Sequence, residues 1–499
     1  MSSKLVATRT APIHLAGPWA FLLASSAIYF FTINEADNDL WGHVLFGRYI
    51  LAHGAVGQVD PFSYTVTGQP WVNHEWLSQV VLAAAYAWVG SPGLLLLKFA
   101  VATFTFLLLF SIIRRRSDTP FIWGGVGMLT VAVLARGFAI RPQIFTYCGA
   151  AMTLWLIDRY RCGQRRALWL FPLLFVVWAN MHGGFILGLA ILGFFACAEV
   201  LCGAERSWQP WCALTASVAV TAFNPYGPRL LLYVWNELSR SHPITEWQHA
   251  APTDVAQFVF FAMLGALVLT LPLRRDWRQN GWEVLLALGV GLLALRHQRH
   301  TPVFALCAAA PLAAQLENAK SWLVERSAFA LSLAAQRIIG VAIVMLAILQ
   351  LSLTGARLWR DRLQVVFDSR DYPVAAVRAL DDAGVSLNLA VPLDWGEYVL
   401  WFLSPQVKVS LDGRFATVFP EQVVADNFDF FTGAPTWRRL LDQYPTEGVL
   451  LPAGWSCPIQ REPEWRRIYG DAVAEIYVRM DRTLHLPAAP ATTEPGIFP

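Results

Sequence analysis

Apolar runs long enough to enter or cross a lipid bilayer recur through the first 355 residues of the chain. A membrane-spanning helix needs about 20 mostly apolar residues, because the hydrocarbon core is about 30 Å thick. With 56% hydrophobic and 15% charged residues, the chain differs in composition from ordinary soluble proteins. The sequence therefore predicts an α-helical polytopic membrane protein. The runs cover residues 15–33, 77–89, 94–113, 120–135, 143–157, 167–179, 185–201, 210–223, 256–273, 284–295, 301–316 and 338–353.

The loops between these runs alternate in charge, and the alternation predicts a topology. One class of loops, together with the N-terminus, carries 16 positive residues, whereas the other class carries 7. The positive-inside rule places the basic class in the cytoplasm. The alternation holds if residues 77–89 lie at the interface or re-enter the membrane instead of crossing it. The prediction is then about 11 transmembrane helices, with the N-terminus in the cytoplasm. The less basic loops, expected outside, are 34–76, 136–143, 180–184, 224–255 and 296–300.

The composition changes to that of a soluble domain at about residue 356. Helix and strand patterns alternate after this point, which predicts a small α/β domain over residues 356–486, following a transmembrane domain over residues 1–355. The topology places the small domain outside the cell. Residues 487–499 are rich in Pro, Ala and Thr and are predicted to be disordered. The expected helices are 372–383, 395–403, 420–431 and 436–443, and the expected strands are 388–392, 407–411, 448–452 and 472–478.

The most polar stretch of the membrane part is the first outer loop, residues 34–76, which we interpret as an active-site loop. It contains Asp37-Asn38-Asp39, then an amphipathic helix over residues 40–52 and a short extended piece over residues 62–66. If the segment is extended, Asp37 and Asp39 point to one side of it. They could there share a divalent cation such as Mg²⁺ or Mn²⁺, or one could act as a general base. The alternative is that Asp39 caps the helix that follows it.

His74 and Glu75 close the same loop and are further candidates for catalysis. They are not part of an HExxH zinc motif, because no histidine follows at the required spacing. The alternative is that they form the polar, interfacial end of the apolar run that follows.

Basic residues of the other outer loops are candidates for binding an anionic headgroup. A guanidinium matches the geometry of a phosphate and binds it through two hydrogen bonds. The alternative for each arginine is snorkelling to the phosphates of the bilayer, and for the histidine of WANMHGG it is a tie between neighbouring helices. The candidates are Arg136, Arg141, His182, Arg296, Arg299 and His300.

The first apolar run followed by a large outer loop with the acidic motif Asp37-Asn38-Asp39 resembles the GT-C superfamily of polytopic glycosyltransferases. The amphipathic helix of the loop, the many-spanned body and the soluble C-terminal domain are similar as well. The chain also resembles a group of bacterial membrane proteins that share patterns present here as DLWGH, DPFS, HEWL, RPQ, WANMHGG, NPYG and a C-terminal DGR.

This resemblance implies an enzyme of the cytoplasmic (inner) membrane that acts in the cell envelope. It would transfer a hexosyl or pentosyl group from a polyprenyl-phosphate carrier to an acceptor on the extracytoplasmic face. Asp37 or Asp39 would be the base or a ligand of the divalent cation, His74 and Glu75 would complete the site, and arginines would hold the carrier phosphate. The acceptor, whether glycan, lipid or protein, stays open, and no nucleic-acid partner is expected.

Two other functions fit the same residues. A transporter or flippase for a lipid-linked or anionic substrate would use the same arginines, but the sequence has no internal repeat of the kind that transporters show. An envelope-assembly scaffold would use the C-terminal domain as its interaction module. The acidic first loop favours the enzyme.

Overall fold

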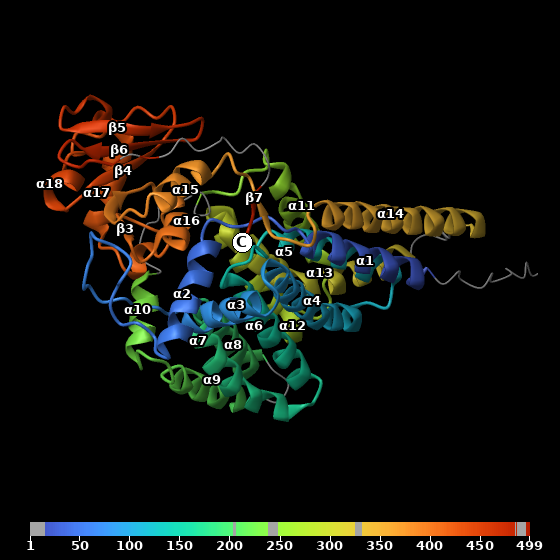
Figure 1. Cartoon of the computed structure of the whole chain (residues 1–499). Coiled ribbons are helices and arrows are strands. Elements are labelled where there is room, and N and C mark those ends of the chain that lie inside the picture. The colour runs from blue at the N-terminus through green and yellow to red at the C-terminus, as the bar shows by residue number, and fades with distance from the viewer. Residues whose placement is uncertain (1–14, 203–205, 238–247, 325–331, 485, 487–495) are drawn as a thin grey trace, which may run out of the picture.

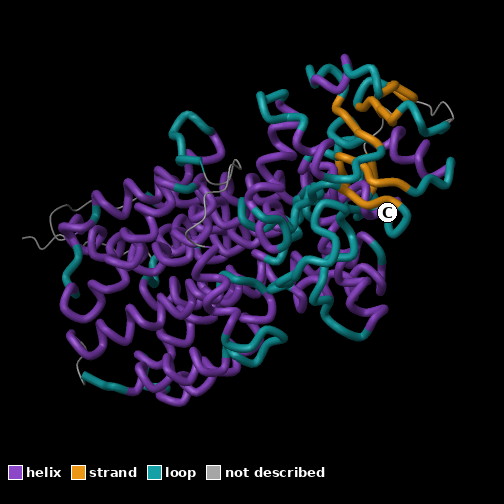
Figure 2. The backbone as a smooth tube through the Cα atoms, turned by 90° about the vertical axis from the view of Figure 1, so that its left-hand side faces the viewer, coloured by secondary structure: helices purple, strands orange, loops and turns teal. Residues whose placement is uncertain are grey.

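The computed structural model describes residues 15–202, 206–237, 248–324, 332–484, 486 and 496–499, and these are mostly helical, with a small C-terminal sheet (Figures 1 and 2). The N-terminus that we predict to be cytoplasmic begins outside the described residues. The α-helices of the membrane part are α1 (Ala16–Phe31), α2 (Leu40–His53), α3 (Trp76–Val89), α4 (Ser91–Arg116), α5 (Pro120–Ala135), α6 (Gln143–Arg161), α7 (Phe171–Met181), α8 (Phe185–Cys202), α9 (Gln209–Val220), α10 (Arg229–Glu237), α11 (Val255–Leu269), α12 (Trp277–Arg296), α13 (Thr301–Val324) and α14 (Leu333–Arg360).

Within the described ranges, three helices are long and apolar enough to cross a membrane by length and composition, namely α4, α8 and α14. Each predicted apolar run contains a helix, and α5 has the predicted bounds. The number of about 11 crossings stays a prediction. α14 continues to Arg360, a few residues beyond the boundary predicted at residue 355.

The two classes of loops gather in two separate clusters. In the basic class, Arg116 at the end of α4 contacts Glu283 of α12 at 2.6 Å, and Arg274 lies 3.7 Å from the same carboxylate. In the less basic class, Trp76 donates a hydrogen bond to Asn180 at 2.9 Å, and the Asn73 backbone N–H donates to the Tyr226 hydroxyl at 2.7 Å. These contacts agree with the alternation predicted from charge. The sidedness itself stays a prediction.

Helix α3 begins and ends within the second cluster. Its first residue, Trp76, contacts Asn180. Just past its last residue, the Ser91 hydroxyl accepts a hydrogen bond from the backbone N–H of Val365, near the start of the C-terminal domain. Along its length α3 packs so closely on α2 that a Cβ on Gly47 would lie 2.0 Å from the Gln79 carbonyl oxygen. The geometry agrees with the prediction that residues 77–89 do not cross the bilayer.

The C-terminal domain is built on a five-stranded sheet in the order β3-β2-β4-β6-β5, seen at one end of the helical part in Figure 2. β2 pairs in parallel with β3 and β4, and β6 is antiparallel to β4 and β5. Every predicted helix and strand of this domain is present, and β1 (Val366–Phe367) and β5 are additional. The elements are α15 (Val374–Asp382), β2 (Leu387–Ala390), α16 (Leu393–Leu403), β3 (Val407–Val409), α17 (Glu421–Thr432), α18 (Arg439–Gln443), β4 (Gly448–Pro452), β5 (Trp465–Gly470) and β6 (Ala474–Arg479).

The extended piece of the first outer loop lies along the edge of this sheet. The Val409 N–H donates to the Phe62 carbonyl, and the Tyr64 N–H donates to the Val409 carbonyl, each at 3.2 Å. Residues 62–64 therefore lie beside β3 like one more short strand. The C-terminal domain thus docks directly on the loop that carries the acidic motif.

The prediction of disorder was wrong for the end of the chain. β7 (Gly496–Ile497) pairs antiparallel with β1 (Val366–Phe367), and Phe498 is fully buried. Its ring lies 4.4 Å from that of Trp41 in α2. The composition of the segment did not indicate this order. One strand pair and one buried aromatic side chain are enough to order the last four residues. Residues 487–495 lie outside the described residues.

Candidate active site

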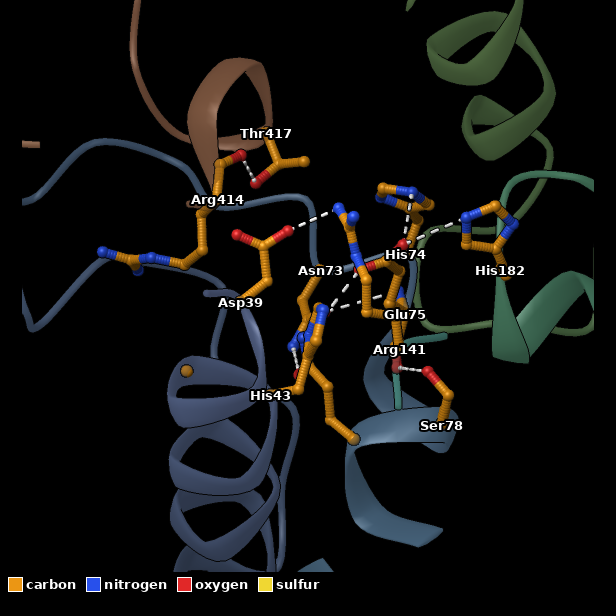
Figure 3. Close-up of polar contacts among 12 residues, drawn as sticks. Asp39, His43, Asn73, His74, Glu75, Ser78, Arg141, His182, Arg414 and Thr417 are labelled. Carbon is orange, nitrogen blue, oxygen red and sulfur yellow. Dashed lines mark hydrogen bonds and ion pairs between the residues drawn. The ribbon is translucent and has the colours of Figure 1, made fainter. Parts of the chain in front are cut away.

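The acidic pair of the first loop is held by an arginine from the second outer loop. Arg141 donates to Asp39 Oδ2 at 2.5 Å through Nη2, and its Nε lies 3.3 Å from Asp37 Oδ1. Asp39 occupies the N-cap position of α2, as the alternative interpretation expected, but its side chain makes no capping hydrogen bond. Its carboxylate pairs with Arg141 instead (Figure 3). The structure therefore brings Asp37, Asp39 and Arg141 together.

The cap of α2 comes from the C-terminal domain. Glu397 of α16 is almost fully buried, and its Oε2 accepts a hydrogen bond from the Gly42 N–H at 3.0 Å. Burial raises the pKa of Glu397 well above its usual range, and the nearby carboxylates of Asp39 and Asp412 raise this pKa further. The neutral form of Glu397 is thereby favoured.

Glu75 lies in a cluster of three histidines next to the acidic pair, Asp37 and Asp39. Its carboxylate oxygens are 3.4 Å from His182 Nε2, 3.7 Å from His74 Nε2 and 4.0 Å from His43 Nδ1. Burial raises the pKa of Glu75, whereas burial lowers the pKa of His43 to about 4 and that of His182 well below its usual range. Burial therefore favours the neutral forms of His43 and His182, which lie beside a carboxyl group whose pKa is raised (Figure 3).

The hydrogen bonds of His182 define its tautomer. The Gly184 backbone N–H donates to His182 Nδ1 at 2.9 Å, so Nδ1 is the unprotonated nitrogen of the neutral ring. The hydroxyl of Thr146 is 2.8 Å from the same nitrogen, and it accepts a hydrogen bond from Trp178 Nε1. Nε2 then carries the proton and faces Glu75. His182 thus belongs to the carboxylate cluster and not to the group of arginines with which the sequence had placed it.

A cavity of about 280 Å³ opens beside the acidic pair. Arg136, Arg141 and Arg299 line it together with Asp37. Arg136 is also 3.8 Å from Asp254. Three of the arginines predicted to bind phosphate therefore share one cavity, and Arg141 joins this cavity to the carboxylates. Its other polar lining residues are Gln143, Tyr147, Gln298 and Thr301.

The remaining two candidates do not reach this cavity. Arg296 is exposed at the end of α12 and is not among the residues that line it. His300 lies in the short 3₁₀ turn over Gln298–His300, with its ring 6.2 Å from that of His297. Burial lowers the pKa of His300 to about 4, and the nearby Arg299 lowers it further.

The DGR motif of the C-terminal domain is tied to the DPFS motif of the first loop. Arg414 is buried and pairs with Asp412 at 2.7 Å and with Asp60 at 2.5 Å. Its guanidinium carbon also lies 4.9 Å from the ring centroid of Phe46 and 4.8 Å from that of Trp71. This buried network fixes the loop against the domain.

The arrangement of donors does not match a divalent-cation site. The structure contains no cluster of three or more His, Cys, Asp or Glu side chains able to hold a metal ion within its described ranges. Asp37 and Asp39 already share a guanidinium, so a cation would have to displace Arg141 from both carboxylates. Binding of a divalent cation stays a prediction.

Sequence reasoning missed the part played by the C-terminal domain. Tyr372 donates a hydrogen bond to Asn38 Oδ1 at 2.6 Å, in the middle of the acidic motif. Glu397 and Gly413 lie on Asp39 from the same side. Glu397 lies at the start of the predicted helix 395–403, and Gly413 lies in the DGR pattern, Asp412-Gly413-Arg414, but neither pattern by itself indicates a contact with the first outer loop.

Comparisons with known proteins do not establish the function of this chain. No protein-family model and no curated protein matches the sequence. The crystal structure of ArnT from Cupriavidus metallidurans bound to undecaprenyl phosphate is similar, with a TM-score of 0.48 and 11% sequence identity. The alignment covers 94% of this chain and 98% of that one. A likeness at this TM-score and identity carries no argument about the chemistry of the site.

Proposed function

We propose that the chain is a membrane glycosyltransferase that moves a sugar from a polyprenyl-phosphate carrier to an acceptor on the extracytoplasmic face. The observation that supports this most is the shared arginine: Arg141 pairs with Asp39 and also lines the cavity that contains Arg136 and Arg299. Such a site offers guanidinium groups for a phosphate and, within reach of the same arginine, a carboxylate for a hydroxyl group.

The chemistry follows from these groups. The acceptor oxygen forms a bond to the anomeric carbon of the sugar while the bond from this carbon to the phosphate oxygen breaks. The electron pair stays on the carrier phosphate, where the arginines of the cavity compensate the charge. The hydroxyl proton passes to the Asp39 carboxylate. Asp37 keeps the N–H of Asp39 hydrogen-bonded at 3.1 Å and so fixes the turn.

Arg141 couples the two halves of the proposed site. In this structure its guanidinium compensates Asp37 and Asp39. A carrier phosphate in the cavity competes with these carboxylates for the same donors. Binding of the donor substrate therefore draws Arg141 away from Asp39. The Asp39 carboxylate is then free to act as the base, and it is freed only when a substrate is present.

The test is sugar transfer in proteoliposomes from a panel of polyprenyl-phosphate-linked sugars. We expect Asp39→Asn to abolish transfer and Asp37→Asn to reduce it, whereas Glu35→Gln, an exposed acid of the same loop, should behave as wild type. Wild-type protein that is folded, transfers nothing and moves a lipid-linked substrate across the bilayer would be a transporter instead. Equal activity of Asp39→Asn and wild type would remove the base from the mechanism.

A further inference from the structure

The helix that follows the acidic motif is capped by a residue from another domain. An aspartate at the N-cap position normally accepts a hydrogen bond from the backbone N–H of the second or third helical residue. Asp39 is at this position of α2, and Gly42 is the third helical residue. The Gly42 N–H donates to Glu397 Oε2 at 3.0 Å, and Asp39 makes no capping hydrogen bond. Glu397 has taken the place of the Asp39 side chain.

Two glycines make room for this exchange. A Cβ at Gly42 would lie 2.2 Å from the Glu397 carboxyl carbon, so only glycine lets this carboxyl group approach the helix start. A Cβ at Gly413 would lie 2.5 Å from Asp39 Oδ1 and 2.7 Å from Glu397 Oε1. The DGR turn therefore lies against both carboxyl groups at once, and the close fit leaves little space for another position of Asp39.

We propose that Glu397 of the C-terminal domain is a positioning residue, which occupies the cap of α2 and so leaves the Asp39 carboxylate turned toward Arg141. The inference rests on the proposed function of Asp39 as the base. Without the Glu397 carboxyl group, the buried N–H of Gly42 loses its acceptor and is best satisfied by Asp39 itself, as in an ordinary N-cap. The base would then point to its own helix and away from the acceptor. The C-terminal domain thus sets the activity without touching the substrate.

The first test compares three variants with wild type in the same transfer assay. Glu397→Ala should lower kcat on the order of a hundredfold, the usual contribution of a positioned base, with little change in the KM for the donor. Glu397→Gln keeps an acceptor for the Gly42 N–H and should retain most of the kcat. Glu421→Ala, which removes an exposed glutamate of the same domain, should have no effect. If Glu397 acted in folding alone, Glu397→Gln would not restore the kcat that Glu397→Ala loses when the stability of the protein is unchanged.

The second test reads the position of Asp39 without any activity. In an experimental structure of Glu397→Ala, Asp39 should accept a hydrogen bond from the Gly42 or Trp41 N–H and should have left Arg141. Gly42→Ala, whose methyl group displaces the Glu397 carboxyl group, should give the same result and replaces Glu397→Ala if that variant does not fold. Asp39 still paired with Arg141 in these structures would overturn the proposal, as would a kcat of Glu397→Gln as low as that of Glu397→Ala. If wild type transfers no sugar, the proposed function fails, but this structural test still decides the position of Asp39.

Discussion

Removal of the buried Arg414 guanidinium should release the first outer loop from the C-terminal domain. The Arg414 guanidinium donates four hydrogen bonds, to Asp60, Asp412 and Ser63, from a position with almost no exposure to solvent. In Arg414→Ala, the two carboxylates stay buried without a counter-charge. Movement of the loop segment that carries Asp60 then lowers the free energy, because it brings the Asp60 charge into water.

The expected magnitude is large. Breaking a buried ion pair by removing one partner costs about 3–5 kcal/mol, because an uncompensated charge remains in the interior. Every 1.4 kcal/mol changes an equilibrium about tenfold, so docking of the loop should weaken roughly a hundred- to a few-thousandfold. The aromatic rings around Arg414 add a cation–π loss of about 0.5–2 kcal/mol. The loop would then open far more often than in the wild type.

Hydrogen exchange of backbone amides measures this opening. The N–H groups of Tyr64 and Val409 join the loop to β3, so their protection should fall by a comparable factor in Arg414→Ala. Arg438→Ala is the matched control, because this arginine pairs with Glu462 at the surface. The variant Asp60→Asn, Asp412→Asn, Arg414→Met carries no stranded charge and should recover most of the protection. Wild-type protection in Arg414→Ala, or no recovery in the triple variant, would refute the reasoning.

Three further predictions follow from the same geometry. Arg299→Ala should raise the KM for the donor about tenfold or more, since a charge-assisted hydrogen bond contributes about 1.5–3 kcal/mol, whereas Arg296→Ala, outside the cavity, should not. Burial raises the pKa of Glu75, so the stability that this group contributes is fully present below its ordinary pKa of 4.5 and is lost as pH rises through the pKa of the folded state. Glutamine does not titrate, so the Tm of Glu75→Gln relative to that of wild type should increase with pH. A Tm difference that stays constant with pH would contradict this. Phe498→Ala should cost about 3–5 kcal/mol of stability in thermal unfolding, and a change below about 1 kcal/mol would show that the C-terminal strand is dispensable.

The sequence was informative wherever one local property decides the structure. Apolar runs and loop charge depend on neighbouring residues alone, and they predicted the helices of the membrane part and the two clusters of loops. The α/β pattern of the C-terminal domain was equally local. β5 was missed because Arg466 and Arg467 interrupt the apolar alternation expected of a strand, and a β-bulge between Arg467 and Tyr469 places the buried Trp465 and Tyr469 in different core clusters.

The site was predictable only in part, because its members come from distant segments. Asp37, Asp39 and Glu75 stood out in one loop, and Arg141 and Arg299 stood out by charge on the outer side. The choice between Arg299 and Arg296 depends on which side of a helix end faces the cavity, and this is a tertiary property. Glu397 gave no signal, because a lone glutamate at the start of a helix usually serves that helix, whereas here it serves α2.

The C-terminal domain holds the acidic loop by three independent means. Residues 62–64 extend its sheet, Arg414 neutralises Asp60 in the interior, and Phe498 packs on Trp41 of α2. A lid that opens in every catalytic cycle would have to break all three, which at several kcal/mol for the ion network alone is too costly for a routine motion. The domain is therefore better described as a fixed wall of the site. Substrates should enter past the arginine-lined cavity, which contains Arg136 and Arg299 and is lined by none of the described residues of this domain.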